Sequence, residues 1–157
     1  MKINLGSGNR KIKDWINVDS DKSTNPDIVA DLNKKFPFKD NSVSTIYCSH
    51  VIEHVDDVLD FMYEIWRVCK HGAEILILAP SCHYLYGAIA PHHKRFIRPK
   101  YFEIWTPPEL HPNKHITENW TTVTKGARFE TVYETIFNEG RELKFILKVN
   151  KEIKNEK

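Results

Sequence analysis

Long hydrophobic runs are missing from this sequence. The longest uninterrupted apolar stretch covers residues 75–80, far short of the roughly 20 residues that span a bilayer. The first residues also lack the apolar segment of a secretory signal peptide. We therefore expect an intracellular, cytoplasmic protein without a membrane span.

Cysteine is scarce as well. The chain has three cysteines, Cys48, Cys69 and Cys82, an odd number that includes no Cys-x-x-Cys spacing. This argues against a disulfide framework and against a four-cysteine zinc site. We expect the three side chains to be buried thiols.

An excess of charge of either sign is also absent. The 23 Lys and Arg residues against 21 Asp and Glu residues give a net charge of +2, with the eight histidines neutral. This balance argues against a large basic nucleic-acid surface and against an acidic disordered tail. With 157 residues the chain has room for one domain with a single core. We assign residues 1–150 to that domain and residues 151–157 to a polar tail.

What is present is an α/β pattern: a series of strands joined by turns and loops, one helix before the fifth strand, and a closing hairpin. Short apolar or β-branched runs bounded by turn residues predict strands, and the last two, joined by a turn with glycine, predict a hairpin. The predicted strands cover residues 2–5, 15–18, 27–30, 43–48, 73–78, 129–137 and 143–149. A short helix is expected over residues 98–105, and the proline-rich residues 106–126 form either a lid or a surface loop.

The clearest element is an amphipathic helix over residues 56–70. Its apolar residues recur at one-, three- and four-residue steps, which places them on one face. Asp56 and Asp57 lie in its first turn and Arg67 in its last, so these charges complement the helix dipole. We expect Gly72 to end this helix.

Glycines and polar residues follow several of the predicted strands. Because the carboxyl ends of parallel strands meet at one edge of a sheet, these residues should share a crevice. They are Gly6, Gly8, Asp19, Asp31, Ser49 and His50. Asp19 could accept both hydroxyls of a ribose, or it could cap a turn. The third glycine and the phosphate-binding helix of a dinucleotide site are missing.

Five segments carry a resemblance to a known family. Residues 5–9 read Leu-Gly-Ser-Gly-Asn, residues 15–19 read Trp-Ile-Asn-Val-Asp, and residues 30–38 contain Ala-Asp-Leu and Phe-Pro-Phe. Residues 46–54 read Ile-Tyr-Cys-Ser-His-Val-Ile-Glu-His, and residues 64–73 form a helix end and turn. In this order the segments resemble the class I S-adenosylmethionine-dependent methyltransferases, in their small Rossmann-like branch.

The resemblance spans residues 3–149 and implies a fold, a cofactor and a set of binding residues. The implied fold class is α/β: a Rossmann-like methyltransferase sheet, mostly parallel, with a C-terminal antiparallel hairpin. The implied cofactor is S-adenosyl-L-methionine. By the resemblance its binding residues are Leu5, Gly6, Ser7, Gly8, Asn9, Asp19, Asp31, Leu32, Ser49, His50 and His54.

Two connections are shorter than the family pattern. The segment between Gly8 and Asp19 is too short for a regular helix, and only seven residues separate Asp19 from Asp27. We therefore expect reduced helices on one face of the sheet. The face flanking the first three strands would then be covered by a homodimer partner or by another protein.

Histidines gather after the fifth predicted strand. Five of the eight lie in residues 83–115, and residues 91–96, Pro-His-His-Lys-Arg-Phe, are similar to a His-x-Arg segment of the family. The resemblance implies that His93 is a base or a substrate-orienting residue and that Arg95 is an anion-binding or structural anchor. His93 could instead fix the loop by a hydrogen bond. We expect acceptor recognition within residues 83–126.

No metal site is expected. His50 and His54 stand four residues apart without a third ligand at a matching spacing. We expect His50 to contact the cofactor and His54 to cap or pack. A looser combination of His111 and His115 with Cys82-His83 is read as solvated loop residues.

A compact basic cluster lies in the same region. It consists of Lys94, Arg95, Arg98 and Lys100. The cluster either binds an acidic substrate, such as a phosphorylated or uronic sugar, or forms a solvated face. Four charges are too few to argue for a nucleic-acid partner.

Two functions follow from these features. The first is methyl transfer from S-adenosylmethionine to a small-molecule or glycan-like acceptor. The second is a binding or scaffold module that keeps the fold and still binds the cofactor but has lost turnover. A nicotinamide oxidoreductase is a weaker third hypothesis, because a pyrophosphate would lack its glycine and its helix.

Overall fold

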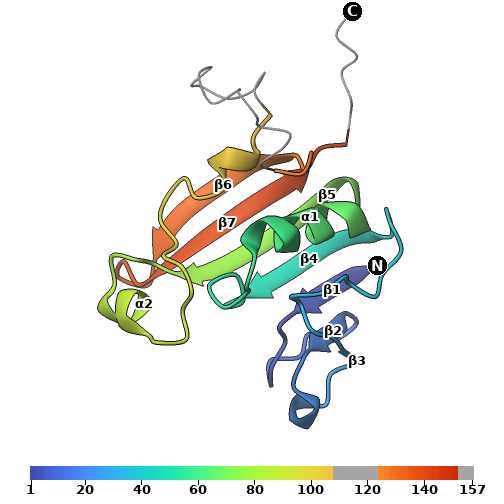
Figure 1. Cartoon of the computed structure of the whole chain (residues 1–157), viewed down its shortest axis with the longest axis horizontal. Helices are drawn as coiled ribbons and strands as arrows, with labels where there is room; N and C mark the ends of the chain where they lie inside the picture. Colours follow the sequence, from blue (N-terminus) through green and yellow to red (C-terminus); the bar gives the residue numbers. More distant parts are fainter. Residues whose placement is uncertain (108–123, 152–157) are drawn as a thin grey trace, which may run out of the picture.

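The computed structural model describes residues 1–107 and 124–151, and its centre is one seven-stranded sheet (Figure 1). The strand order is β3-β2-β1-β4-β5-β7-β6. The strands are β1 (Lys2–Leu5), β2 (Ile16–Asp19), β3 (Ile28–Val29), β4 (Val43–Ser49), β5 (Cys69–Pro80), β6 (Phe129–Phe137) and β7 (Glu142–Val149). The helices are α1 (Val58–Val68) and α2 (Leu85–Ile89), with 3-10 turns at Lys22–Thr24 and Glu103–Trp105. In the described ranges no helix has the length and apolar character to cross a membrane.

The sheet combines parallel and antiparallel pairs. The five strands from β3 to β5 are parallel neighbours, whereas β7 runs antiparallel to both β5 and β6. The hairpin turn between β6 and β7 contains Asn138, Glu139 and Gly140, whose φ angles are 53°, 56° and 84°. The expected α/β fold class, mostly parallel with a C-terminal antiparallel hairpin, is confirmed.

The two faces of the sheet differ in their cover. α1 lies over β4 and β5 on one face (Figure 1). On β5 the alternate side chains of Ile75 and Ile77 are fully buried, whereas Leu76 and Leu78 remain partly exposed, as does Tyr47 on β4. Within the described residues, one face therefore has reduced helical cover, as expected. An apolar strip of the sheet stays open there.

The connection from β1 to β2 has no regular helix, as its length predicts, and a buried asparagine holds it instead. The Asn17 side chain donates to the carbonyls of Ile12 and Trp15 at 3.2 and 3.1 Å and accepts the Ile12 N–H at 2.8 Å. It also accepts from Asn4 Nδ2 at 3.0 Å and donates to Asp27 Oδ2 at 2.8 Å. This satisfied polar network fixes the loop that follows the glycine turn.

α1 ends earlier than the sequence predicts. The Asp57 carboxylate caps its start by accepting two backbone N–H groups. At its other end the backbone turns extended at Cys69, where β5 begins at once. The expectation that Gly72 ends the helix is wrong. Gly72 lies inside β5 with a φ of 74°, where the register against β4 shifts, because a bulge needs a left-handed residue as much as a helix end does.

Smaller differences concern the short elements. β3 has two residues rather than four. Only Glu103–Trp105 of the expected helix over 98–105 is helical, and Lys100, with a φ of 64°, is incompatible with a helix before it. The short helix α2 was not expected at all. Most of the expected lid at 106–126 lies outside the described residues.

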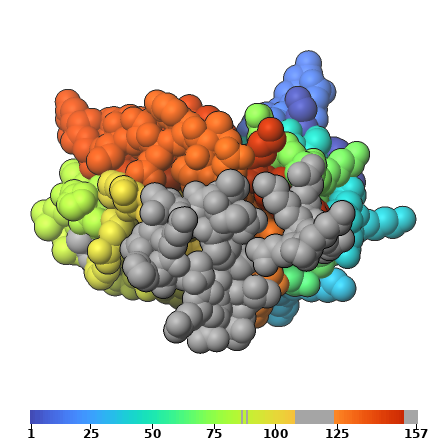
Figure 2. Space-filling view, turned by 90° about the horizontal axis from the view of Figure 1, so that it is seen from above, coloured from blue at the N-terminus to red at the C-terminus, as the bar shows by residue number. Residues whose placement is uncertain are grey.

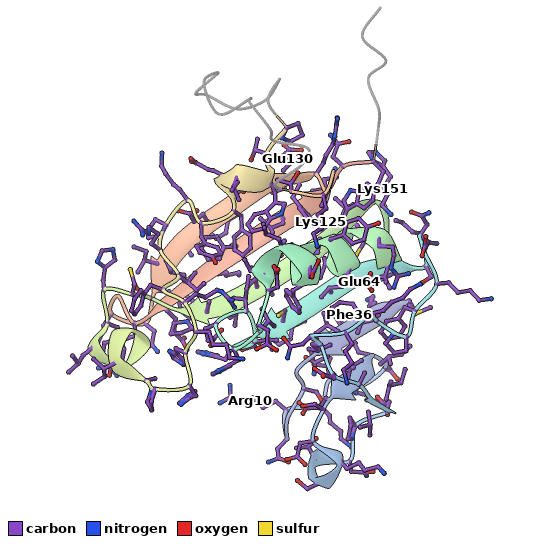
Figure 3. All side chains as sticks on the ribbon, in the orientation of Figure 1. Arg10, Phe36, Glu64, Lys125, Glu130 and Lys151 are labelled. Atoms are coloured by element: carbon purple, nitrogen blue, oxygen red, sulfur yellow. The ribbon has the colours of Figure 1, made fainter. Side chains whose placement is uncertain are left out.

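Arg67, near the end of α1, fixes the loop that precedes β4. Its guanidinium donates to both Glu64 oxygens at 2.8 and 2.7 Å, and to the carbonyls of Phe36 and Phe38 at 3.1 and 3.0 Å. It also pairs with Asp40. Figure 3 shows Phe36 and Glu64 side by side, and the Phe36 N–H donates to Glu64 at 2.7 Å. The helix and the loop are thus one unit.

Candidate functional site

Two hollows open at the carboxyl edge of the parallel strands and meet at Gly6 and His50. Their volumes are about 740 and 210 Å³, and we call them together the cleft. Among the predicted binding residues, the larger hollow is lined by Gly6, Ser7, Gly8, Asn9, Ser49 and His50. The smaller is lined by Gly6, Asp19, Asp31, Leu32, His50 and His54. Leu5 lines neither hollow, because its side chain is fully buried in the core.

The glycine turn after β1 is shaped by two different constraints. Gly6 has a φ of 63°, and a Cβ there would lie 2.2 Å from Val51 Cγ2, so the segment after β4 packs directly on the turn. Gly8 has a φ of 47°, and a Cβ there would meet nothing within 4 Å. Gly6 is therefore required by packing, whereas Gly8 leaves free space on the cleft side.

Asp19, the last residue of β2, fastens this turn. Its Oδ2 accepts the Gly8 N–H at 2.7 Å, and its Oδ1 accepts the Asp21 N–H at 2.9 Å. The capping role left open in the sequence is thus present. A carboxylate offers about four lone-pair directions, so each oxygen can still accept from a ligand hydroxyl.

Asp31 lies after β3 and is more exposed than Asp19. Its Oδ1 accepts the Asn33 N–H at 2.9 Å, and this hydrogen bond lowers the pKa of Asp31. Its Oδ2 lies 3.6 Å from Lys34 Nζ. The strand ends of β2 and β3 thus give the smaller hollow two carboxylates.

His50 stands between two carboxylates. Its Nε2 lies 3.0 Å from Glu142 Oε1, and its Nδ1 lies 3.4 Å from Glu53 Oε1, an ion-pair distance without hydrogen-bond geometry. Glu53 raises the pKa of His50, burial opposes the rise, and Glu142 adds to it. Glu53 is 1% exposed. The cleft therefore contains a histidine that favours its charged form.

Sequence reasoning missed both carboxylates around His50. Glu142 begins β7 and pairs with Pro80, the last residue of β5, so an antiparallel strand delivers it to the cleft edge. Placing the predicted hairpin beside β5 would have revealed it. Glu53 lies in an apolar run after β4, and only its three-residue spacing from His50 hints at a contact.

Arg95 is an anchor for the chain rather than a free cation. Its guanidinium donates to the carbonyls of Ile52 at 2.8 Å and Asp56 at 3.0 Å, and also to that of Val55. The Lys94 N–H donates to the carbonyl of Glu53 at 2.8 Å. Of the two anchor roles considered for Arg95, the structural one is present.

The basic cluster is largely engaged in pairs. Lys94 Nζ pairs with Asp56, and Lys100 Nζ lies 3.5 Å from Glu103 Oε1. With Arg95 bound to carbonyls, the cluster does not present four free charges to an acidic substrate. His111 and His115 lie outside the described residues.

His93, the predicted base or substrate-orienting residue, is half-buried next to the smaller hollow. Its Nδ1 lies 3.1 Å from the carbonyl oxygen of Gly87, so it makes the loop-fixing hydrogen bond that the sequence left open. Its ring packs edge-on against His54, with 5.0 Å between centroids. Since His54 lines the cleft, His93 stands one ring behind that lining.

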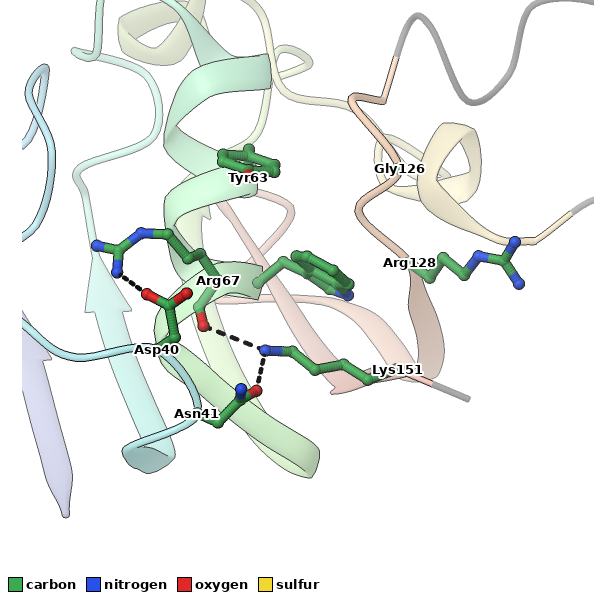
Figure 4. Close-up of a pocket in the computed structure, with 8 residues that line it drawn as sticks. Asp40, Asn41, Tyr63, Arg67, Gly126, Arg128 and Lys151 are labelled. Carbon is green, nitrogen blue, oxygen red and sulfur yellow. Dashed lines mark hydrogen bonds and ion pairs between the residues drawn. The ribbon is translucent and has the colours of Figure 1, made fainter. Parts of the chain in front are cut away.

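A third hollow, of about 480 Å³, lies at the opposite edge, around the start of β4 and the end of β7 (Figure 4). Lys151 Nζ lies 4.6 Å from the Trp66 ring centroid and donates to Asn41 Oδ1 and to the Arg67 carbonyl. Burial lowers the pKa of Lys151. None of the predicted site residues lines this hollow, and its contacts fasten the end of the sheet.

Comparisons with known proteins agree with this geometry. The model of a methyltransferase domain matches residues 12–77. No curated protein matches the sequence. Among solved structures, a SAM-dependent methyltransferase from Archaeoglobus fulgidus shares the fold with a TM-score of 0.61 at 17% identity, covering 94% of this chain and 85% of that one.

Two further solved structures share the fold, but their names describe something other than a methyltransferase alone. The cyclase SpnF gives a TM-score of 0.66 at 10% identity, with 95% of this chain and 74% of that chain covered. A complex from Haloferax volcanii, of the Trm112 methyltransferase activator with a protein named as a methyltransferase, gives a TM-score of 0.57 at 13% identity. It covers 95% of this chain and 82% of that chain. At such identities these matches establish the fold.

The resemblance found in the sequence is confirmed by both kinds of comparison. The domain model covers the segments from β2 to β5, but not the glycine turn before them, and the structures cover nearly the whole chain. The chain therefore has the fold of the class I S-adenosylmethionine-dependent methyltransferases, whose methyl donor is S-adenosylmethionine, and its residues 12–77 match the model of a methyltransferase domain.

Proposed function

We propose that this chain transfers the methyl group of S-adenosylmethionine to a small-molecule or glycan-like acceptor bound at the cleft. The observation that carries the proposal is the meeting of two hollows at Gly6, one at the glycine turn and one at the carboxylates that end β2 and β3. When bound, the cofactor supplies an electrophilic methyl carbon on a positively charged sulfur. The protein then has to hold donor and acceptor in line.

The residues of the cleft suit this cofactor in three respects. Gly8 leaves space where a larger residue would fill it, so a ligand can approach the backbone. The Ser7 hydroxyl is buried and has no hydrogen-bond partner in the described residues, which leaves it available to a ligand. Asp19 and Asp31 present carboxylates suited to the hydroxyl groups of an adenosine.

The acceptor side of the proposal rests on His93. A carbonyl oxygen only accepts hydrogen bonds, so the contact with Gly87 requires a proton on His93 Nδ1. In the neutral ring Nε2 then carries the lone pair. That atom can take the proton of an acceptor hydroxyl or orient the acceptor, while Arg95 holds the segment in place.

Calorimetric titration with S-adenosylhomocysteine tests the cofactor site. We expect saturable heat and a rise in melting temperature in protein shown by circular dichroism to be folded. Absence of both would refute the proposal.

Methyl release from a labelled donor tests turnover and the acceptor class. The panel contains neutral, phosphorylated and uronic sugars, with small amines and carboxylic acids for comparison. We expect one sugar class to stimulate release, and His93→Ala to lower the rate while leaving S-adenosylhomocysteine binding intact. Release restricted to the amines would contradict the glycan-like assignment.

A second candidate is a module that binds the cofactor without transferring its methyl group. The likeness to the cyclase SpnF favours it, since the shared fold occurs there under a name that describes other chemistry. In that case S-adenosylhomocysteine binds but no acceptor stimulates methyl release.

We also propose a homodimer and a cytoplasmic location. The partly exposed apolar side chains of Leu76 and Leu78 would be covered by a second copy on the open face of the sheet. All three cysteines are free, which suits a reducing compartment; Cys48 and Cys69 are buried as expected, but Cys82 is only half-buried, so the expectation was wrong for it. Cell fractionation tests the location.

A further inference from the structure

We propose that His54, His92 and His93 bind a divalent transition-metal ion, with Zn²⁺ the best match, beside the cleft. One ring nitrogen of each histidine lies within 4.8 Å of those of the other two. Sequence spacing paired His54 only with His50 and gave no third ligand. The fold instead brings His92 and His93 to His54, because the segment after α2 packs onto the segment after β4.

The hydrogen bonds of two rings leave the nitrogen that a metal needs. His54 Nδ1 lies 3.1 Å from the carbonyl oxygen of His92, and His93 Nδ1 lies 3.1 Å from that of Gly87. Both carbonyls can only accept, so both Nδ1 atoms carry protons and both Nε2 atoms carry lone pairs in the neutral rings. A backbone carbonyl bound to the far nitrogen is the usual support of a metal-bound histidine.

The two segments that carry the histidines are fastened to each other next to the site. The Lys94 N–H, directly after His93, donates to the Glu53 carbonyl at 2.8 Å, directly before His54. Arg95 then donates to the carbonyls of Ile52 at 2.8 Å and Asp56 at 3.0 Å. These bonds hold the backbone positions of the three ligands, so ion binding requires little ordering of the chain.

A cation at this place would also offset a buried negative charge. The Glu53 carboxylate is 1% exposed, and neither of its oxygens has a hydrogen bond in the described residues. Its Oε1 lies 3.8 Å from His54 Nε2. His50 compensates it from the other side at 3.4 Å. A buried carboxylate without hydrogen bonds is costly, and a divalent ion on His54 would lower that cost.

The chemistry of the ligands points to zinc or a similar ion. Imidazole nitrogens suit Zn²⁺, Cu²⁺ and Ni²⁺ rather than Mg²⁺ or Ca²⁺. Tetrahedral coordination at Zn–N distances of about 2.0–2.1 Å places the nitrogens about 3.3 Å apart, so nitrogens that lie within 4.8 Å of one another must close by at most about 1.5 Å. His92 is exposed and stacks on His54 with 5.1 Å between centroids, so its side chain is free to make this adjustment.

Three protein ligands leave a fourth position for water or for an oxygen of an acceptor. Because His54 lines the cleft, an ion here would orient an acceptor from the side of the smaller hollow. This role rests on the proposed function, whereas the metal site does not. With the ion bound, His93 would act through it and would no longer take up a proton.

Titration of untagged, chelator-treated full-length protein with Co²⁺ and Zn²⁺ tests the site. We expect one Co²⁺ per chain, visible absorption bands of a four-coordinate ion, and displacement by Zn²⁺. His92→Ala and His93→Ala should each weaken Co²⁺ binding at least about tenfold. His83→Ala is the matched control, because His83 is an exposed histidine just before α2 and lies outside the cluster.

His92→Ala keeps the experiment valid if His93→Ala fails to fold, since the His92 side chain is exposed. No Co²⁺ bands, or equal weakening by His83→Ala and His92→Ala, would overturn the proposal. S-adenosylhomocysteine is titrated into the metal-free protein in parallel. Metal binding without S-adenosylhomocysteine binding supports the metal site and refutes the proposed function. S-adenosylhomocysteine binding without metal binding supports the proposed function and refutes the metal site.

Discussion

Gly6 is the residue where the glycine turn touches the segment after β4. A Cβ there would lie 2.2 Å from Val51 Cγ2 and would also sit at a φ of 63°. We predict that Gly6→Ala lowers the free energy of unfolding by about 2–4 kcal/mol, the sum of left-handed strain and overpacking. Urea unfolding measures it.

Two variants separate the strain from the clash. Gly140→Ala, at a φ of 84° with no atom within 4 Å of its Cβ, carries strain alone and should cost about 1 kcal/mol. In a Val51→Ala background the clash is gone, so Gly6→Ala should cost about as little. An unchanged penalty in that background would show that Val51 is not the cause.

Asp19 should contribute more to the affinity for S-adenosylhomocysteine than its exposed neighbours do. We predict that Asp19→Asn weakens S-adenosylhomocysteine binding by about 1.5–3 kcal/mol, roughly tenfold to a hundredfold, because a charge-assisted hydrogen bond is lost. Calorimetry measures the affinity. Asp21→Asn is the control, since Asp21 is exposed and lies outside the cleft lining. Equal affinities for Asp19→Asn and the wild type would contradict the role.

At this scale the sequence predicted the residues that follow strands, because a strand end fixes their place. The places of Gly6, Gly8 and Asp19 at the sheet edge could be predicted from the strand pattern, whereas their binding roles came from the family resemblance. The partners of His50 could not, because Glu53 and Glu142 reach it through the fold. Likewise, the three carbonyl contacts that make Arg95 an anchor are invisible in a sequence.

Among the elements, the end of α1 shows how local signals can compete. Gly72 and the basic residues before it predict a helix end, and the same glycine suits a bulge in β5. The chain ends the helix four residues before Gly72, and β5 starts at Cys69. Strand pairing with β4 therefore outweighed the local helix signal, which a periodicity argument cannot foresee.

The contacts of Arg67 that hold α1 against the loop before β4 should weaken in acid. Burial opposes ionisation of Glu64, but hydrogen bonds from Arg67 and the Phe36 N–H outweigh it, so the pKa of Glu64 is lowered. The hydrogen bond from Arg67 lowers the pKa of Asp40. Groups with lowered pKa values stabilise the fold above their unfolded values, near pH 4, and lose this contribution as the pH falls through the folded values.

Glu64→Gln tests this expectation. At pH 7 the variant should unfold at lower urea than the wild type, since Arg67 loses its bidentate partner. The difference should shrink as the pH falls below the ordinary glutamate pKa, about 4.3, and through the lowered pKa of the folded protein, where the wild-type carboxylate takes up its proton. Lys35 and Lys151 also act on this group or on Asp40, so both remain unchanged in the comparison. A difference independent of pH would contradict the assignment.

For the whole molecule, the open face of the sheet sets the expected assembly. We predict that light scattering at micromolar concentration gives the mass of two chains. Leu76→Glu should give the mass of one chain without loss of the fold, because this side chain is partly exposed and lies outside the cleft lining. A one-chain mass for the wild type would refute the homodimer.

The place of β7 has a consequence for the synthesis of the protein. β7 is the latest strand of the described chain, yet it lies inside the sheet, between β5 and β6. Until it has left the ribosome, β5 has β4 on one side and an unpaired hydrophobic edge on the other. Folding must wait for pairings such as Glu74 with Lys148, which are distant in sequence and slow to form. A nascent chain of this protein therefore exposes an aggregation-prone edge from the emergence of β5 until β7 pairs with it.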